Sequence, residues 1–156
     1  MGDEVQFGAL RLKAIHTPGH TPEHITLLVR EPGAPQPIGA LTGDFLFVGA
    51  LGRPDLLEVA AKVADTMRPS AKALYASATM FQLEANGLLI WPGHGAGSAC
   101  GKSLGSMPHS SLGYEKAVNP GLQAAGRGED AFVDHILEAQ SEPPMYFARM
   151  KKLNKE

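Results

Sequence analysis

Apolar and polar residues alternate along the beginning of the chain with the two-residue period of a half-buried strand. Leu10, Leu12 and Ala14 alternate there with Arg11 and Lys13. Such alternation places apolar side chains on one face of a sheet and charged side chains on the other. Later runs of β-forming and large apolar residues predict shorter, more buried strands. The predicted strands cover residues 5–15, 24–29, 38–42 and 88–91, and the apolar residues 45–48 are expected in the core.

The apolar pattern then changes to the 3.6-residue period of a helix. A first amphipathic helix of about three turns is predicted from the spacing of Leu56, Leu57, Ala60, Val63, Ala64 and Met67. The segment 68–70 contains a proline and is expected to break this helix, and Ser70 is expected to cap the next one. The later helices are predicted over residues 71–84, 112–118, 129–140 and 145–154.

Strands that precede alternating helices and strands indicate a mixed α/β class, and 156 residues suit one domain with a sizeable core. A formal net charge of −2 argues against a nucleic-acid-binding surface. A single cysteine excludes an internal disulfide framework and is typical of a reducing compartment. No apolar run approaches the ~20 residues of a membrane helix. We therefore expect a cytoplasmic protein that binds neither nucleic acid nor membrane.

Three predicted strands each lead to a glycine followed by a side chain that can bind a metal. These pairs are Gly19-His20, Gly43-Asp44 and Gly93-His94. A glycine allows the sharp turn that points such a side chain off the end of a strand. Two imidazoles and a carboxylate are a suitable donor set for Zn²⁺ or Fe²⁺. Taken singly, a loop histidine is commonly structural or solvated and a Gly-Asp pair is commonly a turn, so the argument depends on the recurrence.

These motifs resemble those of the metallo-β-lactamase superfamily. The segment His16-Thr-Pro-Gly-His20-Thr is similar to the third motif of that superfamily, Thr42-Gly43-Asp44 to the fourth and Pro92-Gly93-His94 to the fifth. The resemblance implies an αββα sandwich with one or two metals at the ends of its strands. It implies that His20 and Asp44 are metal ligands, and that His94 is a ligand in two-metal members.

Longer segments resemble the persulfide dioxygenase branch of this superfamily. They are residues 43–56, which read GDFLFVGALGRPDL, residues 92–103, which read PGHGAGSACGKS, and residues 142–150, which read EPPMYFARM. The resemblance extends from about Gly8 to the C-terminus. Members of the branch are often fused to rhodanese domains, and the resemblance implies a mononuclear Fe²⁺ held by two histidines and one aspartate.

The His-x-His-x-Asp-His motif of the superfamily is absent, and no His-x-His pair exists in the chain. We therefore expect residues 1–156 to be one N-terminally truncated domain, a C-terminal portion of the αββα sandwich. The resemblance implies that one iron ligand lies in the missing motif. The metal site of this chain is accordingly expected to be incomplete, with His20 and Asp44 retained and His94 available to complete a substitute site.

Further residues near these motifs are candidates for supporting roles. His24 is expected either to hydrogen-bond to a metal ligand or to be an ordinary satisfied histidine, and His16 is expected to be structural. Arg53 is expected to pair with Asp55 or with a metal ligand, and the resemblance favours a role behind the ligands. Cys100 either fills a small space in a Gly/Ser loop or faces a thiol-substrate pocket, where it would carry a persulfide sulfur.

The resemblance implies a persulfide dioxygenase-like metalloprotein. When complete, it would oxidise a low-molecular-weight persulfide, such as glutathione or coenzyme A persulfide, to sulfite with O₂. The alternative enzyme is a glyoxalase II-like thioester hydrolase that uses Zn²⁺. The alternative from another class is a non-catalytic half-domain that is stable only as an oligomer. A half-domain leaves strand edges and a core face to be covered, so we expect a homo-oligomer with little or no dioxygenase activity.

Overall fold

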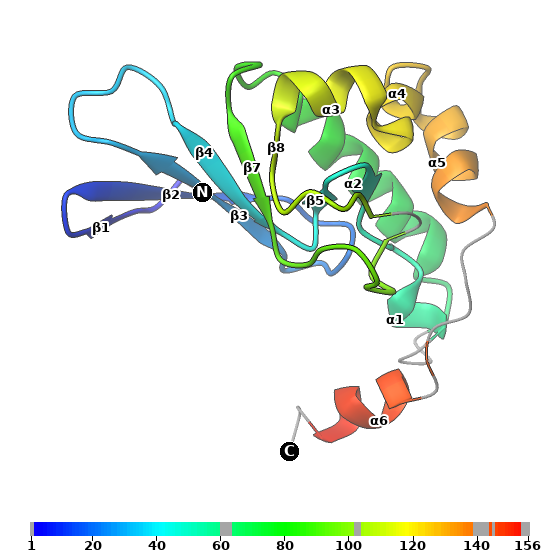
Figure 1. Cartoon of the computed structure of the whole chain (residues 1–156). Coiled ribbons are helices and arrows are strands. Elements are labelled where there is room, and N and C mark those ends of the chain that lie inside the picture. Colours follow the sequence, from blue (N-terminus) through cyan, green and yellow to red (C-terminus); the bar gives the residue numbers. More distant parts are fainter. Residues whose placement is uncertain (1, 60–63, 102–103, 139–143, 145, 154–156) are drawn as a thin grey trace.

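A six-stranded sheet forms one layer of the fold in the computed structural model, which describes residues 2–59, 64–101, 104–138, 144 and 146–153 (Figure 1). The strand order is β1-β2-β3-β4-β7-β8, and only the β4–β7 pair is parallel. These strands are β1 (Glu4–Phe7), β2 (Leu10–His16), β3 (Ile25–Arg30), β4 (Gly39–Gly43), β7 (Leu89–Pro92) and β8 (Ser110–Ser111). A two-stranded hairpin, β5 (Leu46–Phe47) and β6 (Ala50–Leu51), follows β4.

Helices pack against one face of this sheet (Figure 1). The helices are α1 (Leu56–Val59), α2 (Met67–Phe81), α3 (Leu112–Val118), α4 (Pro120–Ala125), α5 (Glu129–Leu137) and α6 (Tyr146–Leu153). Leu28, Ala40 and Ile90 of the sheet meet Leu74 and Phe81 of α2 in one buried cluster. The helix α5 packs on α2, and α6 lies apart from the sheet in Figure 1.

The opposite face of the sheet is apolar and partly open to solvent. Because cross-strand neighbours share a face, the register Leu27–Leu41–Trp91 places these three side chains together, away from the helices. The large apolar residues exposed on this face are Val5, Phe7, Ile25, Leu41 and Leu89. In the part of the chain that the structure describes, this sheet therefore has an apolar face that is partly open to solvent.

The first predicted strand is in fact two strands. Residues 5–15 form the β1–β2 hairpin, in which Val5 pairs with Leu12 and Phe7 with Leu10. The chain reverses at Gly8, whose φ of +61° is a left-handed conformation that glycine adopts without strain. The apolar positions change from odd-numbered (Val5, Phe7) to even-numbered (Leu10, Leu12) across Gly8, and this change of phase is the sequence signal of the turn.

The helix boundaries around Pro69 were predicted wrongly. Met67 and Pro69 belong to the first turn of α2, where a missing backbone N–H costs nothing because such groups have no intrahelical partner. The chain instead turns at Asp65, and the helix starts after Thr66 without a side-chain cap. The first predicted helix begins as α1 (Leu56–Val59). Its continuation over residues 60–63 lies outside the described residues.

The second helix also ends earlier than predicted, at Phe81 rather than near Glu84. The helix over 112–118 is confirmed as α3, but α4 and the short strand β8 were not predicted. The signal for α4 is the pair Asn119-Pro120. The Asn119 side chain accepts hydrogen bonds from the first turn, and Pro120 suits the first helical position. The helix predicted over 129–140 begins at Glu129 as α5 but ends at Leu137, because Glu138 is extended. The predicted limits of the last helix, residues 145 and 154, lie outside the described residues.

The mixed α/β class and most of the predicted strands are confirmed, whereas Val48, expected in the core with residues 45–47, is only half-buried. Sheet and helices form a mixed α/β fold with one helical layer on the sheet. Phe45, Leu46 and Phe47 are fully buried, and the predicted strands over 24–29, 38–42 and 88–91 occur within one residue at each end. No helix among the described residues is long and apolar enough to cross a membrane.

Candidate metal centre

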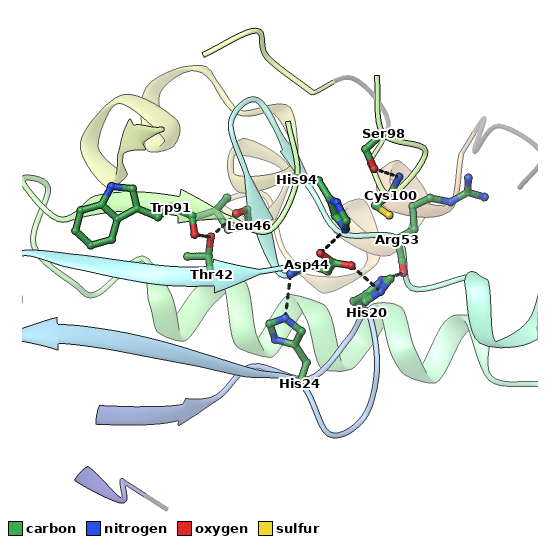
Figure 2. A network of polar contacts seen from close by, with 10 residues as sticks. All are labelled: His20, His24, Thr42, Asp44, Leu46, Arg53, Trp91, His94, Ser98 and Cys100. Carbon is green, nitrogen blue, oxygen red and sulfur yellow. Dashed lines mark hydrogen bonds and ion pairs between the residues drawn. The ribbon is translucent and has the colours of Figure 1, made fainter. Parts of the chain in front are cut away.

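Three loops at one end of the sheet bring two histidines to a single aspartate. His20 follows β2, Asp44 follows β4 and His94 follows β7 (Figure 2). The Nε2 atom of His20 lies 3.4 Å from Oδ2 of Asp44, and Nε2 of His94 lies 3.1 Å from Oδ1. Both oxygens of one carboxylate therefore face an imidazole nitrogen. These are the three residues that the glycine-containing motifs predict as metal ligands.

The orientation of His20 suits metal binding. Its Nδ1 lies 2.9 Å from the backbone oxygen of Arg53. A carbonyl oxygen only accepts hydrogen bonds, so Nδ1 carries the hydrogen and Nε2, which faces Asp44, is the nitrogen left for a metal. Metal-binding histidines in proteins are usually held in this way, with the other ring nitrogen bonded to a carbonyl or carboxylate. The donor set and its support fit a divalent metal such as Zn²⁺ or Fe²⁺.

The backbone of Arg53 is itself held by a buried ion pair. The guanidinium donates from Nε to Oδ1 of Asp55 at 3.0 Å and from Nη2 to Oδ2 at 2.7 Å. The two side chains are 1% and 4% exposed. A bidentate pair in this setting fixes the loop that presents the Arg53 carbonyl to His20. The prediction that Arg53 pairs with Asp55 is confirmed.

Two glycines allow the loops to approach closely around Asp44. A Cβ atom at Gly52 would clash severely with the backbone oxygen of Asp44. At Gly93 a Cβ would lie 3.0 Å from Oδ1 of the same residue. Thr42 supports this turn from the other side, since its hydroxyl donates to the backbone oxygen of Leu46 at 2.6 Å. Asp44 thus occupies a position with little room for displacement.

His24 holds the backbone of Asp44. Its Nε2 accepts a hydrogen bond from the Asp44 N–H at 3.1 Å (Figure 2). Its Nδ1 lies 2.8 Å from the hydroxyl of Thr17. The Thr17 hydroxyl also bonds to that of Thr26. Burial lowers the pKa of His24 from its ordinary value, and the nearby His20 lowers it further. A neutral ring with hydrogen on Nδ1 satisfies both contacts.

His16 and Cys100 occupy different surroundings. The ring of His16 donates from Nε2 to the Pro22 carbonyl at 2.7 Å, which agrees with the structural role expected for it. Cys100 has its sulfur close to the centre. Its Sγ, a carboxylate oxygen of Asp44 and a ring nitrogen of His94 all lie within 4.8 Å of one another. The cysteine is half-buried.

The three candidate ligands are identifiable from the sequence, but most of the groups that hold them are not. Hydrogen bonding of His24 to a ligand was one of two expectations, and the structure resolves it in favour of that bond. The hydrogen bond between Thr17 and His24 was not predicted. The position of the threonine, directly after His16 and before a proline, is the sequence signal that could have suggested it. Nothing in the sequence pattern indicates that Arg53 acts through its backbone carbonyl.

No protein-family model matches the chain. Among solved structures, a metallo-β-lactamase from Staphylococcus aureus subsp. aureus COL is 42% identical, with a TM-score of 0.85 over 98% of this chain and 42% of that chain. The chain belongs to the metallo-β-lactamase superfamily. ETHE1 from Myxococcus xanthus is 29% identical, with a TM-score of 0.67 over 95% of this chain and 54% of that chain.

A third superfamily structure, of the protein TTHA1623 in a di-iron-bound form, is 28% identical with a TM-score of 0.50, and covers 77% of this chain and 46% of that chain. Two curated proteins of Mus musculus are also similar. The mitochondrial persulfide dioxygenase ETHE1 is 29% identical over 78% of this chain and 39% of its own length. A hydroxyacylglutathione hydrolase-like protein is 26% identical over 89% of this chain and 54% of its own length. The chain thus spans about half or less of these superfamily relatives.

Proposed function

We propose that this chain supplies metal ligands to a persulfide dioxygenase-like centre in which His20, Asp44 and His94 bind the ion. The observation that carries the proposal is the convergence of two imidazole Nε2 atoms on opposite oxygens of the Asp44 carboxylate. Without a cation between these three donors, only protonated histidines would balance the negative charge of the Asp44 carboxylate. A divalent cation satisfies all three at once.

The proposed substrate is a small thiol persulfide, such as glutathione or coenzyme A persulfide. The names of the mouse persulfide dioxygenase and of M. xanthus ETHE1 support this reaction class. Fe²⁺ bound by histidines and a carboxylate supplies open coordination positions for O₂ and a sulfur ligand. In the overall reaction a persulfide, O₂ and water give the thiol, sulfite and two protons.

The residues of this chain have distinct roles in the proposal. His20 and His94 present neutral imidazole lone pairs, and Asp44 contributes the negative charge. Arg53 holds the hydrogen of His20 on Nδ1 through its carbonyl, so that Nε2 stays available. His24 fixes the Asp44 backbone through the N–H that it accepts. Since no His-x-His pair exists in the sequence, we expect weaker metal binding than in a relative that contains one.

A chimera tests the proposal. The chain replaces the matching segment of M. xanthus ETHE1, and O₂ uptake and sulfite release are measured with glutathione persulfide after loading with Fe²⁺. We expect activity that His20→Ala and Asp44→Ala abolish, whereas the exposed His109→Gln retains it. A folded, iron-loaded chimera that consumes no O₂, beside an active parent protein, would refute the proposal. The unaided chain is expected to show little or no activity.

A second enzymatic candidate is a glyoxalase II-like hydrolase. The name of the hydroxyacylglutathione hydrolase-like relative supports it. The Asp44 carboxylate also supports it, because each of its two oxygens lies close to an imidazole nitrogen. Zn²⁺ would then activate water for attack on a thioester. Hydrolysis of a glutathione thioester by the zinc-loaded chimera, without O₂ uptake on the persulfide, would favour this candidate.

A third candidate, of a different class, is a non-catalytic half-domain that is stable as an oligomer. The exposed apolar sheet face, which includes Leu41 and Leu89, favours it. A sheet face of this kind normally packs on a second layer about 10 Å away. A chain that is folded and oligomeric but binds no detectable metal would favour this candidate over both enzymes.

A further inference from the structure

The sulfur of Cys100 joins the cluster on which the proposed metal site rests. Among the described residues, Asp44, His94 and Cys100 are the group that offers one oxygen, one nitrogen and one sulfur within 4.8 Å of one another. Tetrahedral ligands at zinc bond lengths of 2.0 to 2.3 Å are separated by about 3.3 to 3.8 Å. The existing separations therefore need a contraction of at most about 1 to 1.5 Å to surround one ion.

The backbone of Cys100 is tied to the same segment that orients His20. The Arg53 N–H donates to the Cys100 carbonyl at 3.3 Å, and Nη1 of Arg53 donates to the carbonyl of Ala99 at 3.4 Å. The Cys100 N–H in turn donates to the hydroxyl of Ser98 at 3.2 Å (Figure 2). One arginine thus holds His20 through its carbonyl and the Cys100 loop through its N–H groups.

We propose that Cys100 is a thiolate ligand of the metal, which it binds together with Asp44 and His94. This inference rests on the proposed metal site and extends its donor set from nitrogen and oxygen to sulfur. A set of one thiolate, one imidazole and one carboxylate suits Zn²⁺, which accepts all three donor types. His20, already proposed as a ligand, lies at the second oxygen of Asp44 and completes a set of four ligands.

Ligation changes the thiol in a defined way. The S–H bond breaks, a sulfur–metal bond forms, and the proton leaves to the buffer, so metal binding releases a proton from Cys100. No oxidation or reduction is involved. Since the sulfur is occupied by the metal, it is not free to carry a substrate sulfur while the ion is bound. This differs from the role in a substrate pocket that sequence reasoning offered for Cys100.

Cobalt binding tests the inference, because a cysteine thiolate bound to Co²⁺ gives a near-ultraviolet sulfur-to-metal charge-transfer band. The metal-free chain is titrated with Co²⁺ under reducing, anaerobic conditions. We expect the band in the wild type and in the control His16→Gln. We expect Cys100→Ser to lose the band, and to weaken Co²⁺ binding by at least the roughly 10- to 100-fold that loss of a residue behind a ligand costs. Far-ultraviolet circular dichroism checks that each variant is folded.

Alkylation of the cysteine provides a second measurement. Saturating Zn²⁺ is expected to slow the reaction of Cys100 with iodoacetamide in the wild type but not in Asp44→Asn. Cobalt binding by the wild type without the charge-transfer band, or zinc-independent alkylation, would overturn the thiolate assignment and leave the proposed function standing. A wild type that binds neither Co²⁺ nor Zn²⁺ would overturn both.

Discussion

The buried Arg53–Asp55 ion pair predicts a large loss of stability when one partner is removed. Asp55→Ala leaves a guanidinium that is 1% exposed without the carboxylate to which it donates at 3.0 and 2.7 Å. Removal of one member of a buried pair costs about 3–5 kcal/mol, which is a large part of a typical unfolding free energy of about 5–15 kcal/mol. The double variant Arg53→Met/Asp55→Leu leaves no buried charge and is expected to recover much of this loss.

Urea unfolding at a fixed protein concentration measures this effect. With an m-value of about 2 kcal/mol/M, the expected loss lowers the midpoint by about 2 M. Lys72→Ala, which breaks the half-exposed pair between Lys72 and Glu129, is the control and should change the midpoint little. Asp55→Ala should also weaken Co²⁺ binding, because the Arg53 carbonyl no longer holds His20 in place. A loss below about 1 kcal/mol in Asp55→Ala would refute the reasoning, because it would equal that of a surface pair.

Three further predictions concern the close packing, the pH dependence and the open sheet face. Gly52→Ala should cost about 1–3 kcal/mol and weaken metal binding, since the new Cβ displaces the Asp44 backbone, whereas Gly87→Ala, in open space, should do neither. The unfolding free energy of the metal-free chain should fall as the pH drops below about 6.5. In this range His24 is protonated in the unfolded chain but stays neutral in the folded chain, because its native pKa is lowered. His24→Gln should flatten this pH dependence, and an unchanged slope would contradict the prediction. Light scattering should detect a dimer or larger assembly that Leu41→Lys shifts toward monomer, and a monodisperse wild-type monomer with a cooperative thermal transition would count against it.

The sequence was sufficient to predict the positions from which the three proposed ligands come. Gly19-His20, Gly43-Asp44 and Gly93-His94 each follow a strand whose apolar pattern is visible. Because β2, β4 and β7 run in the same direction, their C-terminal ends lie at one edge of the sheet. Local rules decide these elements, so they can be recognised without tertiary information. The same holds for α3, whose start at Ser111 carries a capping hydroxyl.

The supports of the ligands could not be predicted for a physical reason. The Arg53 carbonyl contacts His20 across 33 positions of sequence, and a backbone group has no residue-type signature. A hydrogen bond from His24 to a ligand was one of two expectations, but the backbone N–H of Asp44 that it holds has no residue-type signature either. The boundary errors have another cause, since Pro69 is unfavourable inside a helix but harmless in its first turn, and only the tertiary path of the chain decides which applies.

Metal stoichiometry in the wild type and in Asp44→Asn tests the central claim most directly. Both proteins are purified without metal, loaded with Zn²⁺ or Fe²⁺ under anaerobic conditions, freed of excess ion and analysed by mass spectrometry for metal per chain. Asp134→Asn, which changes an exposed aspartate on α5, is the matched control. The account predicts about one ion per chain in the wild type and the control, and almost none in Asp44→Asn. Equal metal content in Asp44→Asn and the wild type would contradict it.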